Sequence, residues 1–194
     1  MSEIIKSSLE DHLNTVRSLE SYTPVIKRIS SIFASAIRRN KKIIFFGNGG
    51  SAADAQHLAA ELVGRFKKKR RPLSALALTT NTSILTALGN DFGFEYVFSM
   101  QIEAMGNPGD IAVGISTSGN SKNVLCGLQK AKEKRMKTVG FLGRDGGEIK
   151  NAVEIPLIIS SDDTARIQEA HILIGHIICE IVERKLFNSL RLVI

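Results

Sequence analysis

The chain is 194 residues long, 43% hydrophobic and 23% charged, the composition of a globular protein with enough residues to bury a core. No apolar run approaches the length of a membrane span, and the first residues do not resemble a secretory signal, so we expect a cytoplasmic protein without a membrane partner. Cys126 and Cys179, the two cysteines, lie in apolar helical patterns, which predicts small buried side chains and no disulfide.

The formal net charge is +7, and much of the excess lies in the basic run 67–71. We favour a solvated helix end for this run, because cations there complement the helix dipole. Steering of a small anionic substrate ranks second. Direct nucleic-acid binding ranks last, because basic and aromatic residues do not interleave as a stacking platform requires.

Residues 1–40 show helical periodicity and no strand pattern. One apolar stripe is formed by Ile5, Leu9, Leu13 and Val16. A second helix begins near Pro24, a residue favoured in the first helical turn. Two helices before the first strand are more than a simple doubly wound domain needs. We expect their apolar faces to cover the sheet or an oligomer interface.

Beyond residue 40, apolar runs typical of buried strands alternate with helical patterns. The predicted strands are 43–46, 74–79, 110–115, 137–142 and 153–159. The predicted helices are 52–66, 82–104 with an interruption near Gly89, 121–135 and a last helix from about 163 to 187. This alternation predicts an α/β fold, a five-stranded parallel sheet between two layers of helices, in a single domain spanning 1–194. The role of the apolar ending 190–194 is left open.

A glycine-rich turn follows the first predicted strand and opens a helix: Gly47-Asn48-Gly49-Gly50-Ser51-Ala52. It matches the loose G-x-G-x-x-G/A dinucleotide pattern, but the second strand ends at 78–82 without the carboxylate that a ribose requires. A Walker P-loop is excluded, because no Gly-Lys-Ser/Thr follows the turn. The unpartnered N–H groups of the helix start nevertheless suit an anion.

The turn after the third predicted strand carries four hydroxyl groups in six residues: Ser116-Thr117-Ser118-Gly119-Asn120-Ser121. One hydroxyl would be enough to cap the following helix. Four hydroxyls beside the backbone N–H groups of a helix N-terminus predict a phosphate cradle that needs neither metal nor lysine. We call residues 116–121 the serine loop.

His57 and Glu61 lie four residues apart, on one face of a predicted helix. Taken alone, they are typical of a polar helix face. The last helix carries Gln168, His171 and His176, and spacing does not choose between its two histidines. His57, Glu61, Gln168 and one of these histidines would form a nitrogen and oxygen set suited to zinc or another divalent ion. They would also supply groups for proton transfer.

Several segments together resemble one family, in order and at family-like spacing over nearly the whole chain. They are Gly47-Asn48-Gly49-Gly50-Ser51, Glu61-Leu62-x-Gly64-Arg65, Gly89-Asn90-Asp91-Phe92-Gly93-Phe94, Gly114-Ile115 with the serine loop, and Arg166-Ile167-Gln168-Glu169-x-His171. The chain resembles the sugar isomerase (SIS) family and, within it, the sedoheptulose 7-phosphate isomerases, also called phosphoheptose isomerases. The serine loop alone marks only the SIS fold. The Asn90-Asp91 and Gln168-to-His176 segments make the match much sharper.

The resemblance implies a homotetramer that converts sedoheptulose 7-phosphate into D-glycero-D-manno-heptose 7-phosphate, the first step towards the heptoses of bacterial lipopolysaccharide, lipooligosaccharide or capsule. It implies that Glu61 is the catalytic base and His176 its acid partner, which selects His176 over His171. The implied ligands of one zinc ion per subunit are His57, Glu61, Gln168 and His176. The implied substrate contacts are Asn48, Gly49, Gly50, Ser51, Glu61, Asn90, Asp91, Ser116, Thr117, Ser118, Ser121 and Gln168.

Two points stay open at this stage. Family members often carry an acid just before Arg166, where this chain has Ala165, so the contacts around the sugar chain are undecided. The alternative function is that of a non-catalytic SIS protein that binds the DnaA replication initiator. Such proteins share the glycine turn and the serine loop but lack the acid/base pair, whereas this chain has both Glu61 and His176.

Overall fold

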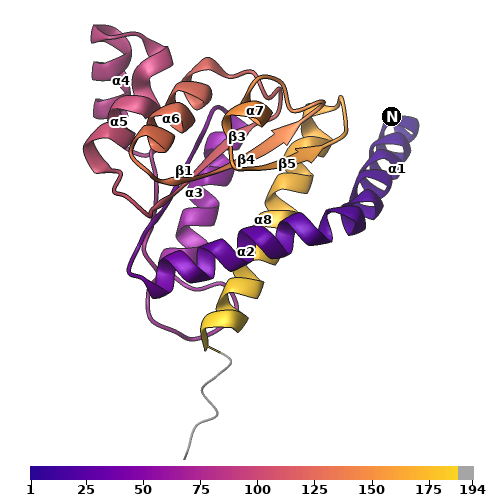
Figure 1. Cartoon of the computed structure of the whole chain (residues 1–194). Helices are drawn as coiled ribbons and strands as arrows, with labels where there is room; N and C mark the ends of the chain where they lie inside the picture. The colour runs from indigo at the N-terminus through magenta and orange to yellow at the C-terminus, as the bar shows by residue number, and fades with distance from the viewer. Residues whose placement is uncertain (188–194) are drawn as a thin grey trace, which may run out of the picture.

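The computed structural model describes residues 1–187, so the ending 190–194 lies outside the described residues. Five parallel strands form one sheet, with helices on both of its faces (Figure 1), as predicted. In spatial order the strands are β2 (Ala75–Ala77), β1 (Ile43–Gly47), β3 (Ile111–Ser116), β4 (Lys137–Gly143) and β5 (Ile155–Ile159). The helices are α1 (Ser2–Ser18), α2 (Thr23–Arg38), α3 (Gly50–Val63), α4 (Thr82–Asp91), α5 (Val97–Met105), α6 (Lys122–Glu133), α7 (Ile149–Ala152) and α8 (Thr164–Phe187), with 3-10 turns η1 (Leu19–Tyr22) and η2 (Phe94–Tyr96).

The apolar strand runs of the sequence are explained by two separate cores, one on each face of the sheet. Ile43 and Phe45 of β1 pack into a core with α2, α3 and α8. Ile44 and Phe46 point the other way, into a core with α5, α6 and α7. A strand covered on both faces has to be apolar throughout, and every residue of β1 is buried. The three-layer α/β arrangement is therefore confirmed.

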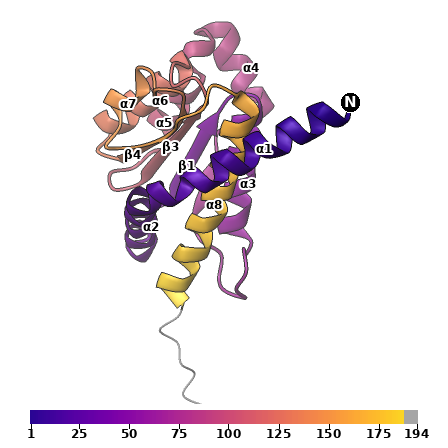
Figure 2. The same cartoon turned by 90° about the vertical axis from the view of Figure 1, so that its right-hand side faces the viewer.

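The two N-terminal helices have different environments. Helix α2 buries Ile29, Phe33 and Ile37 in the core that it shares with α3 and α8. Helix α1 buries no residue, and its side chains Ile5 and Leu9 are each 59% exposed. It projects from the body of the molecule (Figure 2). One predicted helix thus covers the sheet, whereas three members of the apolar stripe of the other, Ile5, Leu9 and Leu13, stay exposed within residues 1–187.

Some predicted details of the helices need correction. The predicted interruption of 82–104 is present but lies slightly after Gly89, because α4 continues to Asp91. The helix ends before Gly93, whose φ of +100° is a conformation that glycine tolerates and a helix cannot contain. Helix α7, between β4 and β5, was not predicted, since four residues are too few to show a helical period. Cys179 is buried and Cys126 only half-buried, and both are free thiols.

The basic run 67–71 is not a solvated helix end. Helix α3 ends at Val63, and the run lies in the irregular segment before β2. Within it, Arg70 is buried beside Glu183 of α8, with Nε 2.7 Å from Oε1 and both side chains only 1% exposed. Sequence alone gave no sign of this pairing, because its partner lies more than a hundred residues away. Across residues 1–187, no helix combines the length and apolar character needed to cross a membrane.

Helices α3 and α8 lie side by side on one face of the sheet (Figure 1). They approach closely because Gly175 of α8 has no side chain: a Cβ built there would lie 2.8 Å from Cδ1 of Leu58 in α3. Leu58 is 2% exposed, so it has little room to move aside. The separation of the two helices therefore depends on this glycine.

We predict that Gly175→Ala destabilises the protein. Overpacking of a filled core costs about 1–3 kcal/mol, which exceeds the gain of at most about 1 kcal/mol in helix propensity. Gly89→Ala is the matched control, because a Cβ at Gly89 in α4 would meet no atom nearer than 3.9 Å. Urea unfolding should give a lower free energy of unfolding for Gly175→Ala and an equal or higher one for Gly89→Ala. Equal values for the two variants would contradict the close contact.

Candidate active site

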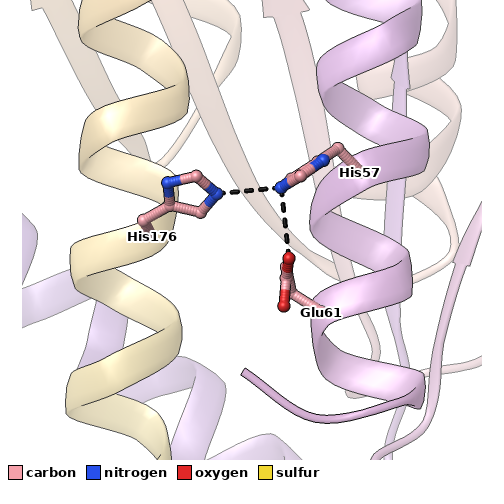
Figure 3. A group of neighbouring side chains, drawn as sticks. All are labelled: His57, Glu61 and His176. Carbon is pink, nitrogen blue, oxygen red and sulfur yellow. Dashed lines mark hydrogen bonds and ion pairs between the residues drawn. The ribbon is translucent and has the colours of Figure 1, made fainter. Parts of the chain in front are cut away.

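Three of the predicted site residues meet between α3 and α8 (Figure 3). The Nε2 atoms of His57 and His176 are 2.9 Å apart, and Oε1 of Glu61 lies 3.2 Å from Nε2 of His57. His57 and Glu61 share a face of α3 because they are one helical turn apart, and His176 reaches them from α8. Residues 119 positions apart in the chain are thus brought into contact by the packing of two helices.

The ligand atoms of His57, Glu61 and His176 all lie within 4.8 Å of one another. Two imidazole nitrogens and one carboxylate oxygen form a donor set that suits zinc, and a three-ligand site leaves a coordination position for substrate or water. On donor type and convergence, the residues present fit a divalent metal ion. The group therefore combines a candidate metal site with a candidate acid–base pair.

Gln168, the fourth predicted ligand, lies beside the start of α3. Its side chain lies against Gly50: a Cβ built on Gly50 would be 2.7 Å from its Oε1. Gly50 opens α3, about two helical turns before His57. The structure thus puts the amide of Gln168 beside the glycine turn, where a substrate contact was expected. Its role as a metal ligand stays a prediction.

The structure separates the two histidines of α8. His171 is fully buried and donates a hydrogen bond from Nε2 to the carbonyl of Leu142, at 3.0 Å. Burial lowers the pKa of His171 to about 4. The pKa of His176 is also lowered, chiefly by burial and then by His57, while Glu61 acts in the opposite direction. His171 is thus part of the core, and His176 is the histidine that faces α3.

Asp54 was not singled out from the sequence, although it lies one turn before His57. Its carboxylate has a pKa raised to about 6, because burial disfavours the charged form more than His57 favours it. Its Oδ2 is buried and has no hydrogen-bond partner within the described residues. In a helix that carries both polar and apolar residues, the sequence does not indicate whether an aspartate is buried. Asp54 was therefore not predicted.

The serine loop forms a compact turn between β3 and α6. The Oγ of Ser116 lies 3.0 Å from that of Ser121 and 3.4 Å from that of Ser118. Gly119 has a φ of +68°, and a Cβ there would collide with the backbone of the 146–147 turn. Three of the four predicted hydroxyl groups therefore gather at the N-terminus of α6, where backbone N–H groups favour an anion.

The glycine turn and the serine loop follow neighbouring strands, β1 and β3, at the carboxyl edge of the sheet. In the order β2-β1-β3-β4-β5 this is the switch point, where parallel α/β sheets bind ligands. Asn48 of the glycine turn and Asn123, in the first turn of α6, are joined by a reciprocal pair of 2.8 Å hydrogen bonds. A cavity of about 310 Å³ beside them is lined by Asn48, Phe94, Glu95, Ser121, Lys122 and Asn123.

The remaining predicted contacts lie around these turns. Gly49 and Gly50 are exposed at the start of α3, and Ser51 is only 3% exposed. Asn90 and Asp91 lie at the exposed end of α4, where the amide of Asn90 donates to Asp91 at 2.7 Å. They precede Phe94, which lines the cavity.

The strand order is that of a doubly wound α/β domain, and the family model described as "SIS domain" matches residues 9–143. Phosphoheptose isomerase from Geotalea daltonii is 54% identical over 192 residues, 98% of this chain and 100% of the relative. That from Aquifex aeolicus is 54% identical over 183 residues, 94% of each chain. The structure of phosphoheptose isomerase from Neisseria gonorrhoeae is 40% identical, with a TM-score of 0.90 over 94% of this chain and 98% of that one. The chain belongs to the SIS domain family and, within it, to the phosphoheptose isomerases.

We predict that the buried imidazole of His171 makes stability depend on pH. As pH falls below about 6.5, the unfolded chain binds a proton at this residue, whereas the folded chain does so only near pH 4. The unfolded state then binds more protons, so the free energy of unfolding decreases by about 1.4 kcal/mol per pH unit between these values.

His171→Gln tests this prediction, because glutamine keeps an N–H donor for Leu142 but does not titrate. Urea unfolding of both proteins at several pH values should give a shallower loss of stability for the variant between pH 6.5 and 4. The pH dependence of the two should coincide above pH 7. Parallel curves throughout would show that His171 is not protonated on unfolding.

Proposed function

We propose that the chain is an aldose–ketose isomerase that converts sedoheptulose 7-phosphate into D-glycero-D-manno-heptose 7-phosphate. The observation that carries the proposal is the meeting of Glu61 and His176 from two helices, in a chain 54% identical to phosphoheptose isomerases over nearly its full length. A carboxylate and an imidazole are the pair that moves a proton between adjacent carbons and oxygens. The alternative, a protein that binds the DnaA replication initiator, has no support from these relatives.

The reaction moves hydrogen between two carbons through an enediol. Glu61 removes a proton from C1 of the ketose, electrons shift to the carbonyl, and the proton is returned at C2 to give the aldose. His176 transfers a proton between the two oxygens, from the hydroxyl at C1 to the former carbonyl at C2. Burial lowers the pKa of His176, which favours the neutral imidazole, the form with one nitrogen that accepts a proton and one that donates.

The substrate is held at both ends in this proposal. The serine loop binds the phosphate, and the helix start of α6 adds its N–H groups. Phosphate binding energy then holds the reacting carbons near Glu61, so a non-phosphorylated heptulose should lose turnover as well as affinity. The proposed contacts are Asn48, Gly49, Gly50, Ser51, Glu61, Asn90, Asp91, Ser116, Thr117, Ser118, Ser121 and Gln168.

The proposed metal is zinc, one ion per subunit, held by His57, Glu61 and His176 with Gln168 as the fourth ligand. When bound, zinc would polarise the substrate oxygens and stabilise the negative charge of the enediolate. Oε1 of Glu61 is the oxygen paired with His57, at 3.2 Å, and the second oxygen of the carboxylate would be the one that takes the proton. One side chain can thus serve both roles.

We also propose that the protein is a cytoplasmic homotetramer whose N-terminal helices, 1–40, lie at a subunit interface. The uncovered apolar stripe of α1 supports this assembly. So does an apolar hollow of about 390 Å³ beside it, lined mainly by Val16, Leu19, Ile26, Leu173, Ile177 and Ile181. Its product would feed the heptoses of lipopolysaccharide, lipooligosaccharide or capsule.

Glu61→Gln should reduce turnover by about 10²–10⁴-fold, since a general base typically contributes that much. The amide keeps the shape of the side chain but cannot accept the proton. Glu133→Gln, an exposed position near the end of α6, is the matched control and should leave the rate unchanged. Wild-type turnover in Glu61→Gln, with an unaltered circular dichroism spectrum, would refute the role of Glu61.

The first experiment is incubation of the purified chain with sedoheptulose 7-phosphate, with the aldose product followed by NMR. It should be run after chelation and again after zinc is restored. Product only with zinc would support both the isomerase and the metal site, while product under both conditions would keep the isomerase and remove the requirement for metal. Absence of product under both conditions would overturn the proposed function.

A further inference from the structure

The imidazole of His176 has an aromatic ring packed on its face. The ring centroid of Phe66 lies 5.3 Å from that of His176, and the two planes are inclined by only 21°. The edge of the same imidazole presents Nε2 to His57 at 2.9 Å. The torsion that sets the plane of a histidine ring is broad, so the rotamer alone does not fix the direction of Nε2. An aromatic ring packed on the face of the imidazole can fix this direction.

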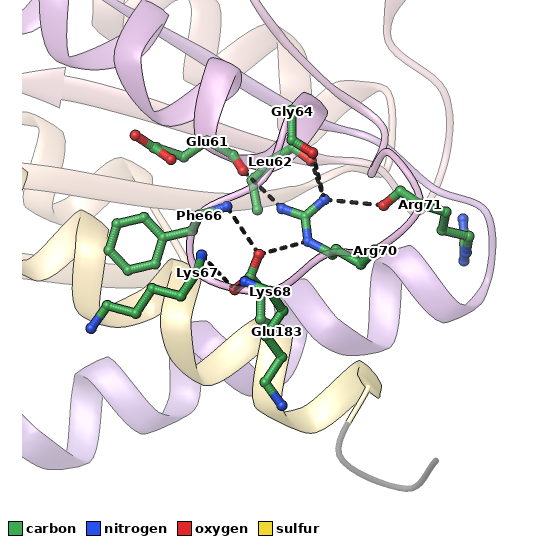
Figure 4. A network of polar contacts seen from close by, with 9 residues as sticks. All are labelled: Glu61, Leu62, Gly64, Phe66, Lys67, Lys68, Arg70, Arg71 and Glu183. Carbon is green, nitrogen blue, oxygen red and sulfur yellow. Dashed lines mark hydrogen bonds and ion pairs between the residues drawn. The ribbon is translucent and has the colours of Figure 1, made fainter. Parts of the chain in front are cut away.

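Phe66 belongs to no helix or strand, yet its backbone is firmly held (Figure 4). The buried carboxylate of Glu183 accepts hydrogen bonds from the backbone N–H groups of Phe66, Lys67 and Lys68, each at 3.0 Å. Three donors converging on one carboxylate fix the direction in which the Phe66 side chain leaves the backbone. Lys67 adds an ion pair to Glu180, one turn beyond His176 on α8, at 2.6 Å.

Arg70 completes this arrangement by connecting it to α3. Its Nε donates to Glu183 at 2.7 Å, while its terminal nitrogens donate to the carbonyl groups of Glu61 and Leu62, at 2.8 and 2.9 Å. These carbonyl groups belong to the last turn of α3, where carbonyl groups have no hydrogen-bond partners within the helix. The buried pair therefore connects the end of the helix that carries Glu61 to the helix that carries His176.

We propose that Phe66 is a positioning residue for His176, and that the Arg70–Glu183 pair holds it in place. Phe66 restrains the plane of the imidazole so that Nε2 stays directed at His57 and Glu61. This role rests on the proposed function of His176 in proton transfer and metal binding. Phe66 would act through the ring of His176, on which it is packed, and not on the substrate.

The test compares Phe66→Leu, which keeps apolar bulk but removes the flat ring, with Phe66→Tyr, which restores the ring. Phe66→Leu should lower kcat and zinc affinity by about tenfold each, as loss of an outer-shell partner does, with KM little changed. Phe66→Tyr should recover both. Phe187→Leu is the matched control, because Phe187 is another partly buried phenylalanine against the same core.

A measurement that needs no activity reports on the stacking itself. In the metal-free protein, the ring current of Phe66 should shift the His176 imidazole protons upfield, and His176→Gln would assign them. The shift should vanish in Phe66→Leu and persist in Phe66→Tyr. Zinc affinity, measured by competition with a chromophoric chelator, completes the comparison.

Arg70→Lys tests the second half of the proposal. Lysine keeps the charge but cannot reach Glu183 and the α3 carbonyl groups together. Its effect on kcat should be non-additive with that of Phe66→Leu, since both would act by freeing the same imidazole. Strict additivity, in variants that still unfold cooperatively, would separate the ion pair from the positioning of His176.

The possible failures can be told apart. If wild-type protein produces no aldose, the proposed function fails, but the ring-current shift and zinc affinity still decide the role of Phe66. If wild-type protein is active and Phe66→Leu keeps its kcat and its zinc affinity, the positioning role is refuted and the isomerase stands.

Discussion

The candidate site depends on how near two helices can approach each other. A carboxylate on α3 and an imidazole on α8 meet only because the backbone of α8 lies close to Leu58, and Gly175 permits this. Functional groups on helices are held rigidly when the core between those helices is close-packed. Strands β1 and β3 fix the glycine turn and the serine loop, since each turn begins where a buried strand ends. The proposed acid–base pair and the proposed phosphate site are thus positioned by different parts of one fold.

Much of the fold could be predicted from local pattern. Apolar runs alternating with helical periods gave the parallel sheet, because each such segment is long enough to show its period. The short helix α7 shows none, and the end of α4 depended on the conformation of Gly93. The basic run was misread for a different reason. Burial of Arg70 is decided by Glu183, a partner that becomes visible only after α3 and α8 are packed.

In the candidate site, too, some residues could be predicted from local spacing and others only from the packed structure. His57 and Glu61 could be paired from spacing, since one helix brings them together. His176 could not be separated from His171 by spacing, and only the resemblance to a family selected it. The structure places His171 in the core and His176 opposite α3, while the catalytic role of His176 stays a prediction. Asp54 and Phe66 had no sequence signal, because burial and stacking are properties of the packed molecule.

The polar bonds of α8 have a consequence along its axis. Apolar faces determine how far apart two helices lie, and directional polar bonds further fix the position of one helix along the other. The hydrogen bond from His171 to the end of β4 and the contacts of Glu183 with the segment after α3 are directional. They lie on either side of His176, five residues before it and seven after it. The position of the His176 imidazole along the axis of α8 is therefore fixed by two sets of polar contacts. Sliding of α8 along its neighbours would have to break both sets at once.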